Sequence, residues 1–238
     1  MRDLIRAEWF KLVKSTGFKV LLICNGATVF TTLLLLVVGA KGTGYNSLII
    51  DLTYVLHHAV VGYLFAAVFL CGEFSNRNFG MSLLCGYSRR TVFLSKALVF
   101  LFGQLLLFLT YTGITTIIMS LGNGFGKKFT MDIFLLLICG ILGYMTMGTV
   151  TVLIATITRK TILAIGIGLG STYALMWLET NIGESRLPLL RYTYIYQIGQ
   201  LESWGEGFSP GIFLVVTLIT IILSLAVATF VFDRTELK

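Results

Sequence analysis

The chain has 238 residues, of which 56% are hydrophobic and only 12% are charged, with a formal net charge of +7. An ordinary soluble domain carries about 25% charged residues, so this composition excludes a soluble globular protein. Apolar runs occur along the whole chain and leave no stretch long enough for a separate soluble domain. The sequence therefore predicts one membrane domain over residues 1–238.

Six apolar segments meet or nearly meet the length of about 20 residues that a helix needs to cross the hydrocarbon core. None contains an acidic or basic residue. The predicted transmembrane helices are 20–40, 52–72, 97–121, 133–158, 161–178 and 211–232. The expected fold class is all-α, a polytopic membrane protein with six spans, an N-terminal segment 1–19, a loop 73–96 and a second long loop 179–210.

Basic residues are distributed unevenly between the two sides of these spans. The N-terminus, the second and fourth connections and the C-terminus together hold 13 Lys and Arg residues, whereas the other three connections hold five. Cytoplasmic segments carry the excess of Lys and Arg, so we expect a multi-pass protein of a bacterial cytoplasmic membrane with both termini in the cytoplasm. The positive charge then reports attraction to anionic lipid, and no nucleic-acid partner is expected.

The N-terminal residues 1–14 have the pattern of an amphipathic helix lying in the membrane interface. Its expected apolar face holds Ile5, Trp9, Leu12 and Val13, and Glu8 falls near this face and breaks the pattern. The alternative is a basic topogenic tail with some helicity.

The loop 73–96 is too long for a simple turn. Phe79, Leu83 and Tyr87 repeat at a spacing of four, which predicts a short helix that presents one apolar face to a partner. Ser88 has the character of an N-cap for a helix that begins with Arg89 and Arg90 and continues into the third span. A cytoplasmic helix between two spans is a place where a soluble motor could act.

This loop resembles the segment between the second and third spans in permeases of the ABC type-2 exporter superfamily. The matching residues are Glu73-Phe74, Gly80-Met81, Leu83-Leu84, Ser88-Arg89-Arg90, Phe93-Leu94 and Lys96. In that family the segment is a coupling helix that docks on the ATP-binding cassette, and the family's usual Pro before the Ser-Arg pair is absent here. The resemblance implies that ATPase coupling involves Glu73, Phe79, Leu83, Leu84, Tyr87, Ser88, Arg89 and Arg90.

The resemblance extends to the N-terminal elbow helix and to a re-entrant outer segment at 179–210. That outer loop holds four acids, Glu179, Glu184, Glu202 and Glu206, against two arginines, and it could attract cationic solutes. A plain surface loop is the alternative. The compact size is most similar to the subgroup for bacteriocin immunity and for export of phenol-soluble modulins or antimicrobial peptides.

Two further pairs of residues in the spans are candidates for function. Gly166 and Gly170 form a small-xxx-small pair that permits a dimer contact, or close packing inside one subunit. His57 and His58 are titratable residues within a span and could line the cargo pathway or sense pH. Neutral histidines bonded within the bundle are the alternative.

Sequence motifs for catalysis or nucleotide binding are absent. No GxxxxGK[ST] loop, HExxH or GxSxG motif occurs, and the four cysteines show no metal-site spacing. No catalytic or metal site is expected on this chain, and ATP and Mg are expected on a separate subunit.

The leading hypothesis is the permease subunit of an ATP-driven exporter. It would pair with an identical or sister permease chain and with a cytoplasmic ABC ATPase, and it would move hydrophobic or amphipathic cargo, peptides above all, for toxin export or antimicrobial peptide immunity. A secondary transporter is the main alternative, although it usually needs an intramembrane carboxylate or lysine, which the predicted spans lack. The third class is a non-transporting membrane anchor or sensor.

Overall fold

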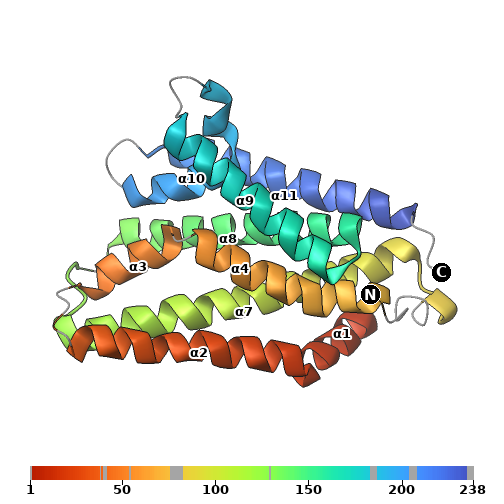
Figure 1. The fold of residues 1–238 in the computed structure, drawn as a ribbon, viewed down its shortest axis with the longest axis horizontal. Coiled ribbons are helices and arrows are strands. Elements are labelled where there is room, and N and C mark those ends of the chain that lie inside the picture. Colours follow the sequence, from red (N-terminus) through yellow and green to blue (C-terminus); the bar gives the residue numbers. More distant parts are fainter. Residues whose placement is uncertain are drawn as a thin grey trace.

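The structure, a computed structural model, describes residues 2–37, 39, 42–53, 55–75, 83–128, 130–182, 187–203 and 208–234. Every regular element within these ranges is a helix, and the long helices run side by side as a bundle (Figure 1). Six of the described helices or helical stretches are long and apolar enough to cross a membrane. The predicted fold class, a polytopic all-α membrane protein, is confirmed.

Five of the six candidate spans are single helices. They are α2 (Thr16–Val37), α7 (Arg89–Asn123), α8 (Met131–Thr158), α9 (Thr161–Asn181) and α11 (Pro210–Asp233). Away from its ends, each helix pairs its backbone N–H and C=O groups internally, which is the condition for a stable span in lipid.

The remaining span, His57–Phe74, is composite. It begins in α4 (Val55–Ala66), passes through one π-helical segment, η1 (Ala67–Cys71), and ends in α5 (Gly72–Ser75). The π-helix is rare and appears mostly as a single wide turn inside an α-helix, frequently at functional sites. A separate helix, α3 (Gly44–Thr53), precedes α4, so the predicted span 52–72 begins inside α3 rather than at the start of a helix.

The helices pack around two apolar cores. α7 contacts α2, α3 and α8, and α8 has its most extensive contact with α11. The first core includes Phe65, Phe100 and Phe232 and lies toward the end of the bundle where α7 begins; the second includes Tyr144 and Phe213 and lies toward the opposite end. α9 rests on α4 and α8, and much of its surface faces away from the bundle.

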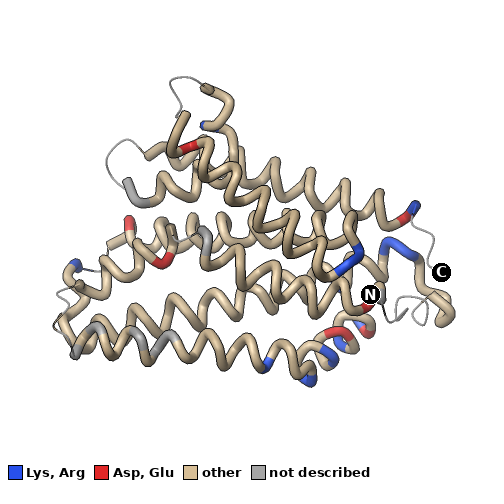
Figure 2. The backbone as a smooth tube through the Cα atoms, viewed as in Figure 1, with Lys and Arg blue, Asp and Glu red and all other residues tan. Residues whose placement is uncertain are grey.

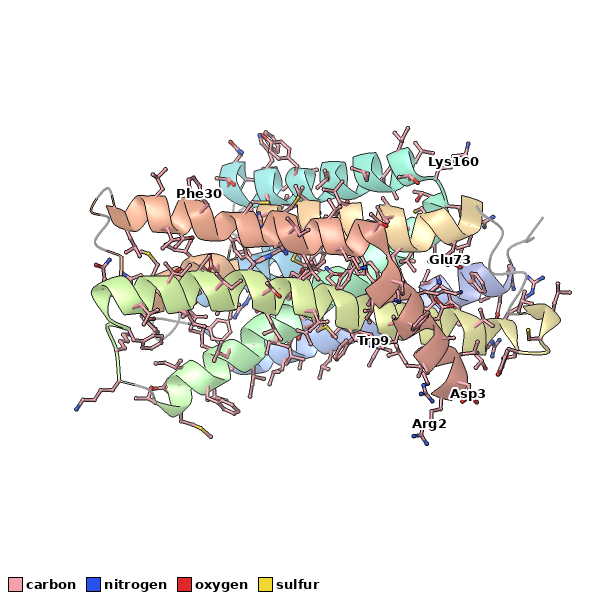
Figure 3. All side chains as sticks on the ribbon, turned by 90° about the horizontal axis from the view of Figure 1, so that it is seen from below. Arg2, Asp3, Trp9, Phe30, Glu73 and Lys160 are labelled. Atoms are coloured by element: carbon pink, nitrogen blue, oxygen red, sulfur yellow. The ribbon has the colours of Figure 1, made fainter. Side chains whose placement is uncertain are left out.

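Both chain termini lie at the same end of the bundle (Figure 1). Figure 2 shows that charged residues gather mainly at this end, with a few at the opposite end and almost none along the middles of the helices. At the terminal end, α1 (Arg2–Lys14) crosses the beginning of α7 at a steep angle (Figure 3).

Three short helices close the opposite end between α9 and α11. They are η2 (Pro188–Tyr192), α10 (Tyr194–Gly199) and η3 (Gln200–Ser203). Ile195, Ile198 and Leu201 are buried in the second core, where α10 packs on α8, α9 and α11. The segment is thus an integral layer of the fold over its described residues.

Candidate functional site

Four charged side chains meet at the end of the bundle that carries the termini. Lys96 Nζ of α7 contacts Glu8 Oε2 of α1 and lies 3.2 Å from Glu73 Oε2 of α5. Lys11 Nζ lies 2.7 Å from Glu8 Oε1 and 3.9 Å from Glu73 Oε1. We call Glu8, Lys11, Glu73 and Lys96 the charge cluster. Its formal charge is zero, with each carboxylate facing both ammonium groups.

Glu8 enters the cluster because of the stripe on which it lies. Leu4, Glu8 and Leu12 repeat at a spacing of four and form the buried side of α1. Burial alone would raise the pKa of the Glu8 carboxyl, but the charges and hydrogen bonds of Lys96 and Lys11 outweigh it and lower the pKa below 4.5. Glu8 is therefore ionised at neutral pH, as a paired buried carboxylate must be.

Lys96 is the most deeply buried member of the cluster. It is 1% exposed, and its Nζ lies 4.9 Å from the centre of the Phe69 ring in the π-helical segment. A cation over an aromatic face is attracted by the ring quadrupole. Lys11 lies at the rim; burial would lower its pKa, but Glu8 and Glu73 outweigh that effect and raise it.

The cluster joins three segments that are distant in sequence. Glu73 and Lys96 flank the loop that connects the second and third spans, and Glu8 and Lys11 belong to α1. Figure 3 shows Glu73 at the same end of the molecule as α1, whose labelled residues are Arg2, Asp3 and Trp9. A displacement of the loop must therefore separate buried charges or move α1 with it.

The C-terminal end of α11 is attached beside the loop by a second set of contacts. Arg90 Nε lies 2.5 Å from Asp233 Oδ2, and Arg89 Nη1 donates to the backbone oxygen of Asp233 at 3.2 Å. Phe232 stacks on Phe93 with ring centres 4.9 Å apart. The Arg90 side chain is 75% exposed, so this ion pair contributes little to stability.

Residues 4–175 match the sequence model of the family described as ABC-2 family transporter protein. The match covers well over half of the chain. The chain belongs to the ABC-2 transporter family. The matched region runs from α1 into α9 and so includes all four residues of the charge cluster. No curated protein matches the chain.

Membership makes the chain a multi-pass ABC-2 permease, a transmembrane subunit of a kind that is typically non-catalytic. The family also implies association with an ABC ATPase subunit. In such a permease, the loop between the second and third spans and the elements attached to it are the candidate coupling site.

Within the loop 73–96 the structure describes residues 73–75 and 83–96, and Phe79 lies outside the described residues. Ser88 caps α7 as predicted, because its side chain accepts a hydrogen bond from the backbone N–H of Thr91 at 3.3 Å. Leu83 and Tyr87 are half-buried against the first core rather than turned outward. Leu84 is 86% exposed and is the apolar side chain that this part of the loop presents to solvent.

The apolar face of α1 differs from the expected one. Leu12 is buried in the bundle and Ile5 and Trp9 are half-buried against it, with the Trp9 ring 5.2 Å from that of Phe102. Val13 is 44% exposed and lies off this face, which faces the protein rather than lipid. Glu8 interrupts the apolar face of α1 because it pairs with Lys96. This partner is 88 residues away, so the local pattern does not include it.

The two glycines proposed as a dimer contact lie on an open face of α9. A Cβ added at Gly166 or Gly170 would meet nothing within 4 Å, whereas one at Gly168 would run into the Tyr63 ring. The small-xxx-small pair is therefore not used for packing within this subunit over the described residues.

The two histidines lie inside the subunit. His58 is buried, and its Nε2 donates to the backbone oxygen of Asp51 at 2.7 Å. His57 stacks on Tyr111 with ring centres 4.3 Å apart. Neither arrangement leaves the imidazoles on the face that carries Gly166 and Gly170.

Asp51 is a buried candidate residue that the sequence analysis does not single out. It was placed just outside the second span, yet it lies in α3, is 5% exposed and accepts a hydrogen bond from the Thr115 hydroxyl of α7. Asp51 lies outside the predicted span 52–72, so the predicted spans themselves contain no acidic residue, but the bundle holds a buried carboxylate beside the second span, where the Thr115 hydroxyl of another helix bonds to it. The signal available in the sequence was the position of Asp51, between the apolar residues 48–50 and the predicted span 52–72.

Proposed function

We propose that this chain is the permease subunit of an ATP-driven exporter in which the charge cluster transmits movement of the cytoplasmic loop to the spans. One observation carries the proposal: Lys96 and Glu73, at the two ends of that loop, are paired with each other, and Lys96 is also paired with Glu8 of α1. The loop, the cytoplasmic end of the second span and α1 then respond as one unit to a push from a cassette ATPase, which would supply ATP and Mg.

The docking surface for the ATPase would centre on Leu84. Leu84 is 86% exposed, so covering its apolar surface with a partner would be favourable, and it lies between the half-buried residues Leu83 and Tyr87. Those two side chains fix the segment on the bundle, so the partner would meet a rigid surface. Arg89 and Arg90, also exposed, add positive charge beside it.

The test is a copurification experiment. The tagged permease is isolated, and the amount of cassette ATPase that remains bound to it is compared with that bound to the wild type. Leu84→Asp should abolish copurification and cargo-stimulated ATP turnover while the permease remains inserted. Leu189→Asp is the matched control, because Leu189 is 76% exposed in the segment at the opposite end of the bundle. Equal ATPase recovery with Leu84→Asp and with wild type would reject the docking surface.

A second permease chain would pack on the open face of α9. Gly166 and Gly170 allow two helices to approach closely, and Ile162, Ile167 and Tyr173 are exposed apolar residues of the same helix. A homodimer predicts that Gly170→Cys forms an oxidant-induced dimer in membranes, whereas Gly26→Cys on α2 does not. Crosslinking at neither position, with a sister permease copurifying, would favour a heterodimer.

The proposed direction is outward and the proposed cargo is an amphipathic, cationic peptide. Glu179 lies half-buried at the outer end of α9 and accepts a hydrogen bond from the Thr193 hydroxyl at 3.4 Å. Glu184 and Glu206 lie outside the described residues.

In reconstituted membranes a cationic amphipathic peptide should stimulate ATP turnover more than a neutral glycan lipid or a small hydrophobic drug. Stimulation by the glycan lipid alone would reject the peptide cargo and leave the exporter class intact.

Asp51 gives the secondary-transporter alternative a specific basis, because such carriers use intramembrane carboxylates to couple to an ion gradient. Family membership favours ATP-driven transport. Cargo movement in vesicles that contain the permease alone, driven by a proton gradient and lost in Asp51→Asn, would decide for the alternative.

A further inference from the structure

A cavity of about 430 Å³ lies between α3, α7 and α8, in the half of the bundle away from the termini. Its walls are mainly apolar and include Leu48 of α3, Phe108 of α7 and Ile141 of α8, with no charged side chain among the lining residues. The volume falls in the range of roughly 300 to 1,000 Å³ that small-ligand sites occupy. The cavity is therefore suited to a neutral, largely apolar ligand.

One wall of this cavity carries a row of hydroxyl groups. Thr112, Thr116 and Ser120 follow one another at a spacing of four and so share one face of α7. Thr112 is 4% exposed, and within the described part of the chain the hydroxyl oxygens of Thr112 and Thr116 are buried without a hydrogen-bond partner.

Neighbouring threonines of the same helix are satisfied. Thr110 donates its hydroxyl to the carbonyl oxygen of Leu106, one turn back, at 2.7 Å, and the Thr115 hydroxyl donates to the Asp51 carboxylate. An unpaired buried hydroxyl is costly away from water. Thr has two accessible χ1 rotamers in a helix, so the hydroxyls of Thr112 and Thr116 can turn to a ligand in the cavity.

The open side of the cavity faces the bilayer. Leu109, Ile117 and Leu121 line it and are 46%, 59% and 83% exposed on the surface of α7. α9, which carries the proposed dimer face, packs on α4 and α8 instead. A ligand would therefore enter from lipid and not from a path between two permease chains.

A positive charge lies near the outer edge of the cavity. Phe125 lines the cavity and packs edge-on against Tyr45, whose ring lies 4.2 Å from Lys127 Nζ. Thr116 lies seven residues before the end of α7 at Asn123, a rise of about 10 Å, and Thr112 lies one turn deeper. A ligand with a phosphate near Lys127 would place its glycerol esters toward Thr116 and the start of its acyl chain beside Thr112.

We propose that this cavity binds one acyl chain of a glycerophospholipid of the adjoining leaflet, with Thr116 donating to its ester carbonyl. The apolar walls accept the chain, the unpaired hydroxyl of Thr116 finds an acceptor in the ester, and the ammonium of Lys127 complements the phosphate. The lack of charged lining residues excludes the cationic face of a peptide. The site is separate from the coupling site and from the proposed cargo path.

The test uses the full-length protein in vesicles of phosphatidylethanolamine and phosphatidylglycerol that contain a trace phospholipid with a diazirine in one acyl chain. The diazirine lipid should label α7 and α8 of the wild type near Thr112 and Ile141. An ether-linked analogue lacks the carbonyl, so we expect it to label about three to ten times less than the ester.

Gly113→Leu should abolish the labelling, because a Cβ at Gly113 meets nothing within 4 Å and the new side chain can fill the cavity without a clash. Gly26→Leu on α2, where a Cβ also meets nothing within 4 Å, is the matched control and should leave labelling unchanged. Thr112→Val combined with Thr116→Val should retain chain labelling and lose the preference for ester over ether.

Equal labelling by ester and ether lipids in the wild type would overturn the proposal. So would unchanged labelling in Gly113→Leu, or complete displacement of the label by a cationic peptide. The ester-to-ether ratio is measured on the wild type, so it decides even if a variant fails to fold.

Discussion

Replacing Lys96 with methionine would remove the buried ammonium that contacts both carboxylates of the charge cluster. Lys11 would remain beside Glu8 and Glu73, but its side chain is 45% exposed, so solvent weakens its attraction to the two carboxylates. Methionine retains an unbranched apolar chain that can pack on the Phe69 ring. The measured loss would therefore report the charge and not the packing.

The size of the effect follows from the burial of the three partners. The side chains of Lys96, Glu8 and Glu73 are 2%, 6% and 14% exposed, so solvent screens their interaction weakly. Removing one partner of a buried ion pair costs about 3 to 5 kcal/mol, because the other charge stays buried and uncompensated. Adding Glu8→Gln removes that stranded charge, so the double variant should regain at least half of the loss.

Thermal unfolding of detergent-purified protein, followed by intrinsic tryptophan fluorescence, measures this loss. One kcal/mol shifts the Tm of a chain of this size by about 2 to 4 °C, so Lys96→Met should lower it by roughly 6 to 20 °C. Lys14→Met, at an exposed position of α1, should change it by less than about 2 °C. The reasoning fails if Lys96→Met behaves like Lys14→Met, or if Glu8→Gln lowers the Tm further in the Lys96→Met background.

Three other outcomes follow. Lys96 and Lys11 lower the folded-state pKa of Glu8. Its stabilising contribution is therefore present at neutral pH and is lost as the pH falls through the folded-state pKa, so on acidification below pH 4.5 the wild type should lose more Tm than Glu8→Gln. Ser88→Ala should cost about 1 kcal/mol through the lost cap of α7, and Ser88→Asp should retain it, both by thermal unfolding. In otherwise cysteine-free chains, an impermeant thiol reagent should label Lys128→Cys in intact cells and Cys85 only after permeabilisation; the opposite pattern would reverse the proposed orientation.

The spans could be predicted from the sequence wherever the apolar run coincides with the helix. α8 and α11 begin and end within two residues of the predicted spans, because their boundaries follow hydropathy alone. The second span was misplaced at its start because Asp51 interrupts the apolar run. Hydropathy treats a carboxylate as water-exposed, whereas here the Thr115 hydroxyl of another helix accommodates it inside the bundle.

The candidate coupling site was only partly accessible from the sequence. The cap at Ser88 and the amphipathic helix at the N-terminus are local patterns, and both were predicted. The charge cluster depends on a contact between Glu8 and Lys96, and no local period relates residues so far apart. The misfit of Glu8 on an apolar face was nevertheless a signal, since a buried carboxylate requires a cation from elsewhere in the fold.

The two sets of contacts around the loop differ in how easily they can break. Separating Lys96 from Glu8 or Glu73 would leave buried charges without a partner, which is costly. We therefore expect α1, α5 and the beginning of α7 to stay together during any movement. The contact between Arg90 and Asp233 is exposed to solvent and can exchange for water with little loss. A push on the loop would thus move α1, α5 and α7 as one body. At the end of α11 the exposed ion pair can break first, whereas Phe232 remains stacked on Phe93 inside the first core and keeps the two helices in contact.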